Sequence, residues 1–77
     1  MMSMSVKERD VMLGRAEDAI LERAVQPKSA AELVRELRRE GIDEYFVRAG
    51  IWFLMDRGRV ELNPERKVVV TPARDRE

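Results

Sequence analysis

Apolar residues return at steps of three and four positions between Lys7 and Arg23, and charged residues fill most of the positions between them. The apolar stripe consists of Leu13, Ala16, Ile20 and Ala24. This period predicts an amphipathic helix over about 7–23. The helix is expected to stop before Pro27, because proline disfavours helical geometry in the residue that precedes it.

The clearest helix start in the chain is at Ser29. Ser29 and Glu32 have the spacing of a capping box, in which each side chain accepts a hydrogen bond from the backbone N–H of the other residue. Apolar residues follow at helical spacing, and Gly41 can adopt the left-handed conformation that ends a helix. These signals predict a second helix over about 30–40.

A third helix is predicted directly after the second. Asp43 is a suitable N-cap, and Ile42 and Val47 are placed to form a hydrophobic staple across it. Gly58 marks the expected end, near Arg57. Because so few residues separate the two helices, the chain must turn sharply between them. This is the helix-turn-helix connection.

After Gly58 the spacing of apolar residues changes from the three- and four-residue steps of a helix to the alternation that is typical of a strand. Residues 59–62 alternate polar and apolar, and residues 68–71 are all β-branched, so both segments are predicted strands. Asn63 and Pro64 suit the first two positions of a type I turn between them. The pattern predicts a β-hairpin and leaves room for a third, very short strand around 25–26.

The composition adds a size limit and a charge balance. The 77 residues are 44% apolar and 39% charged, which fits one small globular domain over 7–71. We expect residues 1–6 to be a disordered N-terminus and residues 72–77 a mobile charged tail. Fifteen basic residues balance fifteen acidic ones, so no domain-wide positive field points to nucleic acid.

Several kinds of chemistry are excluded or disfavoured by what the chain lacks. It contains neither Cys nor His, which removes disulfides, thiol catalysis and the commonest metal ligand. The carboxylate pairs Asp43/Glu44 and Glu61/Glu65 fall at a helix start and around a turn. We therefore expect no enzyme activity, cofactor, metal or small-molecule substrate. No apolar run is long enough for a membrane span or a signal peptide, so a cytoplasmic protein without membrane contact is expected.

The order of elements, three helices closed by a hairpin, resembles the winged helix-turn-helix family over about residues 7–71. The most specific part of the resemblance is the apolar spacing of the third helix and its glycine exit into a strand. The residues with this spacing are Val47, Ile51, Leu54, Gly58 and Val60. The resemblance implies an α+β fold, mainly α, with a helix-turn-helix core and a two-stranded wing. It also implies that the third helix lies in the major groove of DNA.

A step of about 100° per residue divides the third helix into two faces. The inward face consists of Val47, Gly50, Ile51 and Leu54, and the outward face carries Tyr45, Arg48 and Trp52. The resemblance implies that this outward face meets the bases, that Arg66 and Lys67 touch the DNA backbone, and that Lys28 and Ser29 anchor a phosphate. The expected function is a small double-stranded-DNA-binding protein that regulates transcription by occupying a site, as a dimer or within a larger assembly.

Two other interpretations of the same residues stay open. In the first, the outward Tyr45 and Trp52 bind another protein chain, or a second copy in a homodimer, with no direct nucleic-acid role. In the second, the features are only structural: the hairpin or the first helix covers the two aromatic rings, and Arg48 pairs with Glu44 one turn earlier. The arginines of the second helix are likewise expected to be neutralised on their own helix. These are Arg35, Arg38 and Arg39, with Glu32 and Glu36 as partners.

Overall fold

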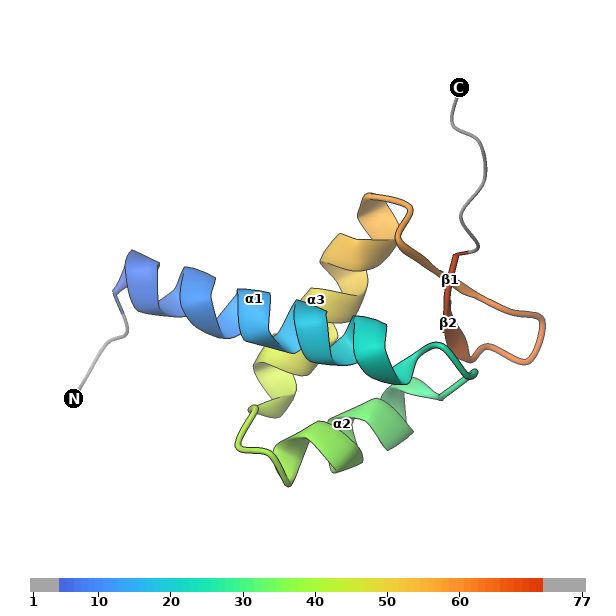
Figure 1. The fold of residues 1–77 in the computed structure, drawn as a ribbon, viewed down its shortest axis with the longest axis horizontal. Helices are drawn as coiled ribbons and strands as arrows, with labels where there is room; N and C mark the ends of the chain where they lie inside the picture. Colours follow the sequence, from blue (N-terminus) through green and yellow to red (C-terminus); the bar gives the residue numbers. More distant parts are fainter. Residues whose placement is uncertain (1–4, 72–77) are drawn as a thin grey trace.

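Three helices followed by an antiparallel hairpin make up the computed structural model, which describes residues 5–71 (Figure 1). The elements in chain order are α1 (Val6–Arg23), α2 (Ala30–Arg38), α3 (Glu44–Asp56), β1 (Val60–Leu62) and β2 (Val68–Val70). The predicted α+β class and its winged-helix-like layout are confirmed. The predictions for residues 1–4 and for the tail 72–77 lie outside the described residues.

The start of α1 differs from the sequence prediction. Ser5 is its N-cap: the Ser5 hydroxyl accepts from the N–H of Glu8 at 3.1 Å, and the Glu8 carboxylate accepts from the N–H of Ser5 at 3.0 Å. The disordered segment predicted over 1–6 therefore does not extend to Ser5 and Val6. The physical reason is a second capping box with the same spacing as the one at Ser29.

The ends of α2 and the start of α3 are set by local hydrogen bonds. Ser29 and Glu32 form the predicted capping box, with bonds of 3.0 and 2.8 Å. The helix ends at Arg38 rather than near residue 40, because the next turn tightens around Gly41, whose φ is 84°. Asp43 caps α3 as predicted, by accepting from the N–H of Tyr45 at 2.9 Å.

One buried cluster joins all three helices and both strands. It includes Ile42 and Val47, the two residues predicted as a staple, and Val60 and Val68 from the hairpin. Helices α1 and α3 approach each other closely at Gly50, where a Cβ would lie 2.9 Å from Cδ1 of Ile20. The absence of a side chain at this position lets the two helices come together.

The hairpin pairs β1 with β2 in the register Val60↔Val70 and Leu62↔Val68. The third short strand for which the sequence leaves room around 25–26 does not form; instead, an isolated bridge joins Lys28 to Val68. Residues 25–26 are exposed and still belong to the turn that follows α1, and Pro27 has no N–H to donate. Lys28 is therefore the first residue after α1 whose N–H and C=O groups both form hydrogen bonds with β2, at 3.0 and 2.6 Å.

Candidate functional site

The outward face of α3 is uncovered, as the helical period predicts. Tyr45 is 61% exposed and Trp52 is 67% exposed, and Arg48 between them is exposed too. The inward residues are buried. Trp52, Met55 and Asp56 line a shallow groove of about 210 Å³. Within residues 5–71, neither the hairpin nor α1 covers the two rings.

The charged groups of α3 are paired with one another and with α2. Glu44 accepts from Nε of Arg48 at 2.7 Å, which is the pair expected one turn apart, and its second oxygen accepts from Arg38 at 3.2 Å. Asp43 adds a further carboxylate at the helix start. The single basic side chain of α3 therefore lies beside an acidic helix N-terminus, which repels phosphate.

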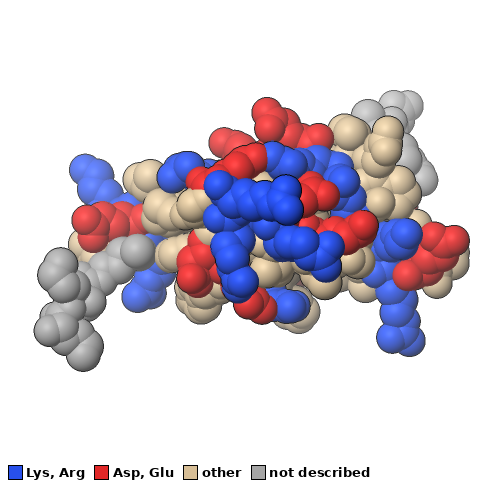
Figure 2. Space-filling model, turned by 90° about the horizontal axis from the view of Figure 1, so that it is seen from below, with Lys and Arg blue, Asp and Glu red and all other residues tan. Residues whose placement is uncertain are grey.

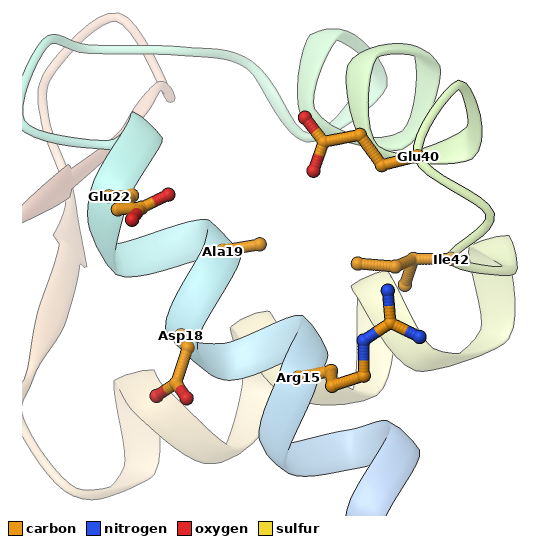
Figure 3. Close-up of a pocket in the computed structure, with 6 residues that line it drawn as sticks. All are labelled: Arg15, Asp18, Ala19, Glu22, Glu40 and Ile42. Atoms are coloured by element: carbon orange, nitrogen blue, oxygen red, sulfur yellow. The ribbon is translucent and has the colours of Figure 1, made fainter.

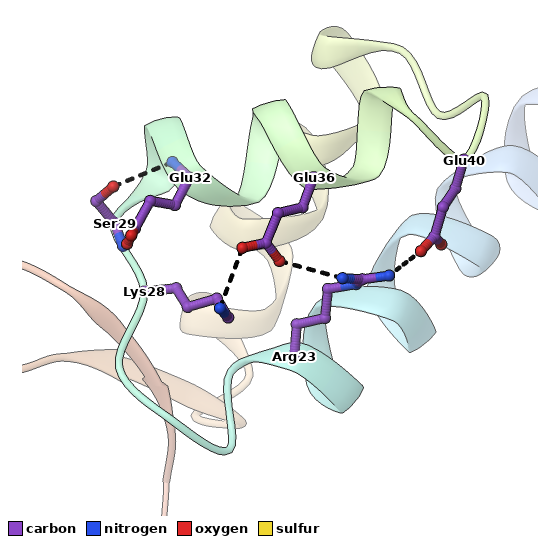
Figure 4. A network of polar contacts seen from close by, with 6 residues as sticks. All are labelled: Arg23, Lys28, Ser29, Glu32, Glu36 and Glu40. Atoms are coloured by element: carbon purple, nitrogen blue, oxygen red, sulfur yellow. Dashed lines mark hydrogen bonds and ion pairs between the residues drawn. The ribbon is translucent and has the colours of Figure 1, made fainter.

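The two residues expected to anchor a phosphate at the start of α2 have partners inside the protein (Figure 4). The Ser29 hydroxyl accepts from the N–H of Glu32, and Lys28 Nζ lies 3.1 Å from a carboxylate oxygen of Glu36. The Glu32 carboxylate itself accepts from the N–H of Ser29, and this bond holds the pKa of Glu32 below its usual value. A negative group thus already occupies the helix N-terminus.

Two further ion pairs join the end of α1 to α2 and to the turn that follows it. Arg23 pairs with Glu36 at 3.1 Å and also with Glu40, so its guanidinium bridges two carboxylates (Figure 4). The pKa of Glu36 is lowered, first by the hydrogen bond from Lys28 and then by the one from Arg23. The carboxylates of Glu32, Glu36 and Glu40 are therefore held by groups outside the exposed face of α2.

The prediction that the arginines of α2 are neutralised on their own helix is wrong. Arg35 and Arg38 lie on α2 and Arg39 is its C-cap. All three are exposed, and we call them the arginine face. Within residues 5–71, no carboxylate lies within 4.0 Å of Arg35 or Arg39, and Arg38 shares Glu44 with Arg48. Figure 2 views the molecule from the α2 side and shows blue side chains gathered across its middle, with red side chains around and between them.

The turn between β1 and β2 carries the other predicted cationic pair. Arg66 is exposed and Lys67 half-buried, and in the described part of the chain neither makes an ion pair. The bridge at Lys28 brings this turn toward the start of α2, and the charge of Lys67 helps to lower the pKa of Glu32. Figure 2 shows blue and red side chains together at this end of the molecule.

A second shallow groove, of about 220 Å³, lies between α1 and the α2–α3 connection (Figure 3). Its lining has mixed charge and consists of Arg15, Asp18, Ala19, Glu22, Glu40 and Ile42. Among residues 5–71, no group of three acidic side chains is arranged to hold a metal ion. No helix in that range is both long and apolar enough to cross a membrane.

The arginine face was missed because its neutralisation was judged from neighbours on the same helix. The groups that bind the glutamates come from elsewhere: Arg23 and Lys28 precede Glu36 by 13 and 8 positions.

Comparisons with protein-family models, with curated proteins and with solved structures give no match.

Proposed function

We propose that this chain binds double-stranded DNA through the arginine face of α2 and the hairpin turn. The observation that carries the proposal is the separation of charge on a chain with no net charge. The glutamates of α2 are bound by Ser29, Lys28 and Arg23, and the arginines of the same helix remain at the surface. Neutrality of the whole chain therefore does not argue against a local basic surface.

The spacing of the three arginines suits a row of phosphates. Positions separated by three and four residues lie on one side of a helix, so Arg35, Arg38 and Arg39 project together. Arginine side chains bind phosphate through two parallel N–H groups and stay charged at any physiological pH. Arg66 and Lys67 supply a second group of cations at the hairpin turn. Contacts of this kind hold a duplex in place without reading its sequence.

The outward face of α3 has a smaller part in this proposal than the family resemblance implies. Arg48 is its only basic residue, and Glu44 lies against it at 2.7 Å. Trp52 and Tyr45 are large aromatic groups, which are uncommon readers of base edges in the major groove. Lys28 and Ser29 have no part in the proposed DNA contact, because their polar groups are already bound within the protein.

A salt titration tests the proposal. Binding of a fluorescent random-sequence duplex is followed by anisotropy, and its affinity should fall steeply as salt rises, because phosphate contacts release counterions. The double variant R35A/R39A should flatten the slope of log affinity against log salt by about 1.8, at about 0.9 per lost phosphate contact. The control K7A/R9A removes two exposed cations from the first turns of α1 and should keep the wild-type slope.

The competing interpretation is a protein-binding module with no nucleic-acid role, and the exposure of Trp52 and Tyr45 favours it. The same titration separates the two. If no duplex is retained even at low ionic strength, the DNA proposal is wrong. An equal loss of binding in the control variant would mean that the attraction is general and does not belong to α2.

A further inference from the structure

We infer that the outward face of α3 is the contact surface of a homodimer in which two α3 helices pack antiparallel about a two-fold axis near Trp52. The face is not covered by the described part of the chain, and it carries an indole that is 67% exposed. Exposed aromatic residues of this size are enriched at the centres of protein interfaces. The occupant that fits this face is a second copy of the same chain.

The argument for a second copy is that the face is complementary to itself. Arg48, Trp52 and Asp56 are spaced by four residues, so they follow one ridge of the helix, with about 6 Å between successive members. One end of the ridge is positive, the middle is aromatic and the other end is negative. When such a ridge meets its own copy in the antiparallel direction, each Arg48 lies opposite the Asp56 of the other copy.

In the described part of the chain, Asp56 has no partner to give up in this exchange, and Arg48 gives up only an exposed pair on its own helix. Asp56 is exposed and has no ion pair within residues 5–71. Arg48 holds Glu44 through an exposed pair one turn away, and pairs of this kind are weakly held. Glu44 keeps Arg38 as a partner at 3.2 Å when Arg48 turns away. The exchange therefore leaves no charge of this group without a partner.

The groove that Trp52 lines in one copy can receive the indole of the other copy. It has a volume of about 210 Å³ and is lined by Trp52, Met55 and Asp56. In a two-fold contact the same patch is used twice, so each Trp52 enters the groove of the other copy. The thioether of Met55 is a soft partner for an aromatic ring. Tyr45, about two turns before Trp52, adds an aromatic edge to the same face.

Charge exchange between two variants tests the register. R48D alone places two aspartates opposite each other, and D56R alone places two arginines opposite each other, so each should weaken self-association at least tenfold in sedimentation equilibrium. A mixture of R48D and D56R restores both pairs, because each chain then offers the sign that the other lacks. The mixed dimer should form as tightly as wild type. A parallel contact would instead oppose like charges in wild type, so its mixture would associate more tightly than wild type.

Trp52 is the only tryptophan of the chain, so its fluorescence reports on its own burial. Wild-type emission should shift to shorter wavelength as the protein concentration rises, and the D56R emission should not. Circular dichroism of both charge variants confirms that they fold. A wild-type chain that stays monomeric up to millimolar concentration would overturn the inference. A mixture that associates no better than its components would overturn it as well, and neither result bears on the DNA titration.

Discussion

Arg66 has a backbone conformation that costs free energy for any residue with a side chain. Its φ is 64°, and it is the only non-glycine residue with a positive φ in the described chain. The turn around it is well bonded: its N–H donates to the carbonyl of Asn63 at 2.7 Å, and the Asn63 side chain accepts from Glu65 and Lys67. These bonds hold Arg66 in the left-handed region.

Arg66→Gly should therefore stabilise the protein. Removing the side chain relieves about 1–2 kcal/mol of left-handed strain. Glycine is also more flexible in the unfolded chain, and this lowers the gain in folding free energy by about 0.4–1 kcal/mol. We expect a net gain of roughly 0.5–1 kcal/mol, measured as a higher urea midpoint. Glu65→Gly in the same turn has no positive φ to relieve, and it should lower the midpoint.

Two helical glycines have opposite surroundings, and alanine should affect them in opposite directions. At Gly14 in α1, a new Cβ would have no atom within 4 Å, so Gly14→Ala should gain about 1 kcal/mol of helix propensity. At Gly50 in α3, the Cβ would lie 2.9 Å from the fully buried Ile20. Overpacking costs about 1–3 kcal/mol, which should outweigh the same propensity gain.

Thermal unfolding of the two variants checks this pair. Gly14→Ala should raise the Tm and Gly50→Ala should lower it. Shortening the neighbour in the double variant Gly50→Ala/Ile20→Val should recover part of the loss, because the methyl group that meets the new Cβ is removed. An unchanged Tm in Gly50→Ala would mean that the terminal methyl group of Ile20 can move away from the new Cβ without cost.

At the scale of elements, what could be predicted from the sequence was local. The caps at Ser29 and Asp43 depend on neighbours two or three positions away, and both were predicted correctly. The bridge from Lys28 to Val68 was misplaced because it depends on where α1 ends in space. The lack of ion-pair partners on the same helix at the arginine face was not predicted for the same reason, since the guanidinium that binds Glu36 comes from Arg23 of a different helix.

At the scale of the whole molecule, Glu36 ties the end of α1 to α2 and makes stability depend on pH. Its pKa is lowered from 4.5 in the folded protein, chiefly by the bond from Lys28. The unfolded chain therefore binds this proton more tightly. The stabilisation is complete above the usual pKa and is lost as the pH falls through the lowered folded value.

Urea unfolding at pH 7 and at pH 3 measures this loss. Wild-type protein should have a lower midpoint at pH 3, and Glu36→Gln should show a smaller difference between the two pH values, because its amide does not titrate. Glu61→Gln is the matched control, since Glu61 is exposed on β1 and makes no ion pair within residues 5–71. It should keep the wild-type difference. Equal differences in all three proteins would contradict the assigned role of Glu36.

The two proposed contacts use different elements, and this removes a conflict between them. A homodimer through α3 would bury the helix that the family resemblance places in the major groove. The arginine face is on α2, so it stays accessible when α3 is covered. A dimer of this kind would carry two arginine faces and two hairpin turns, and a duplex bound by both copies would make twice the phosphate contacts.

The hairpin is bonded on both sides of β2. One edge of β2 pairs with β1, and on the other edge the N–H groups of Val68 and Val70 donate to the carbonyls of Lys28 and Ala24. A hairpin attached in this way cannot swing as a free arm. Any force that a bound partner applies at its tip is passed directly to the end of α1, so the tip and the three-helix body should move as one rigid piece.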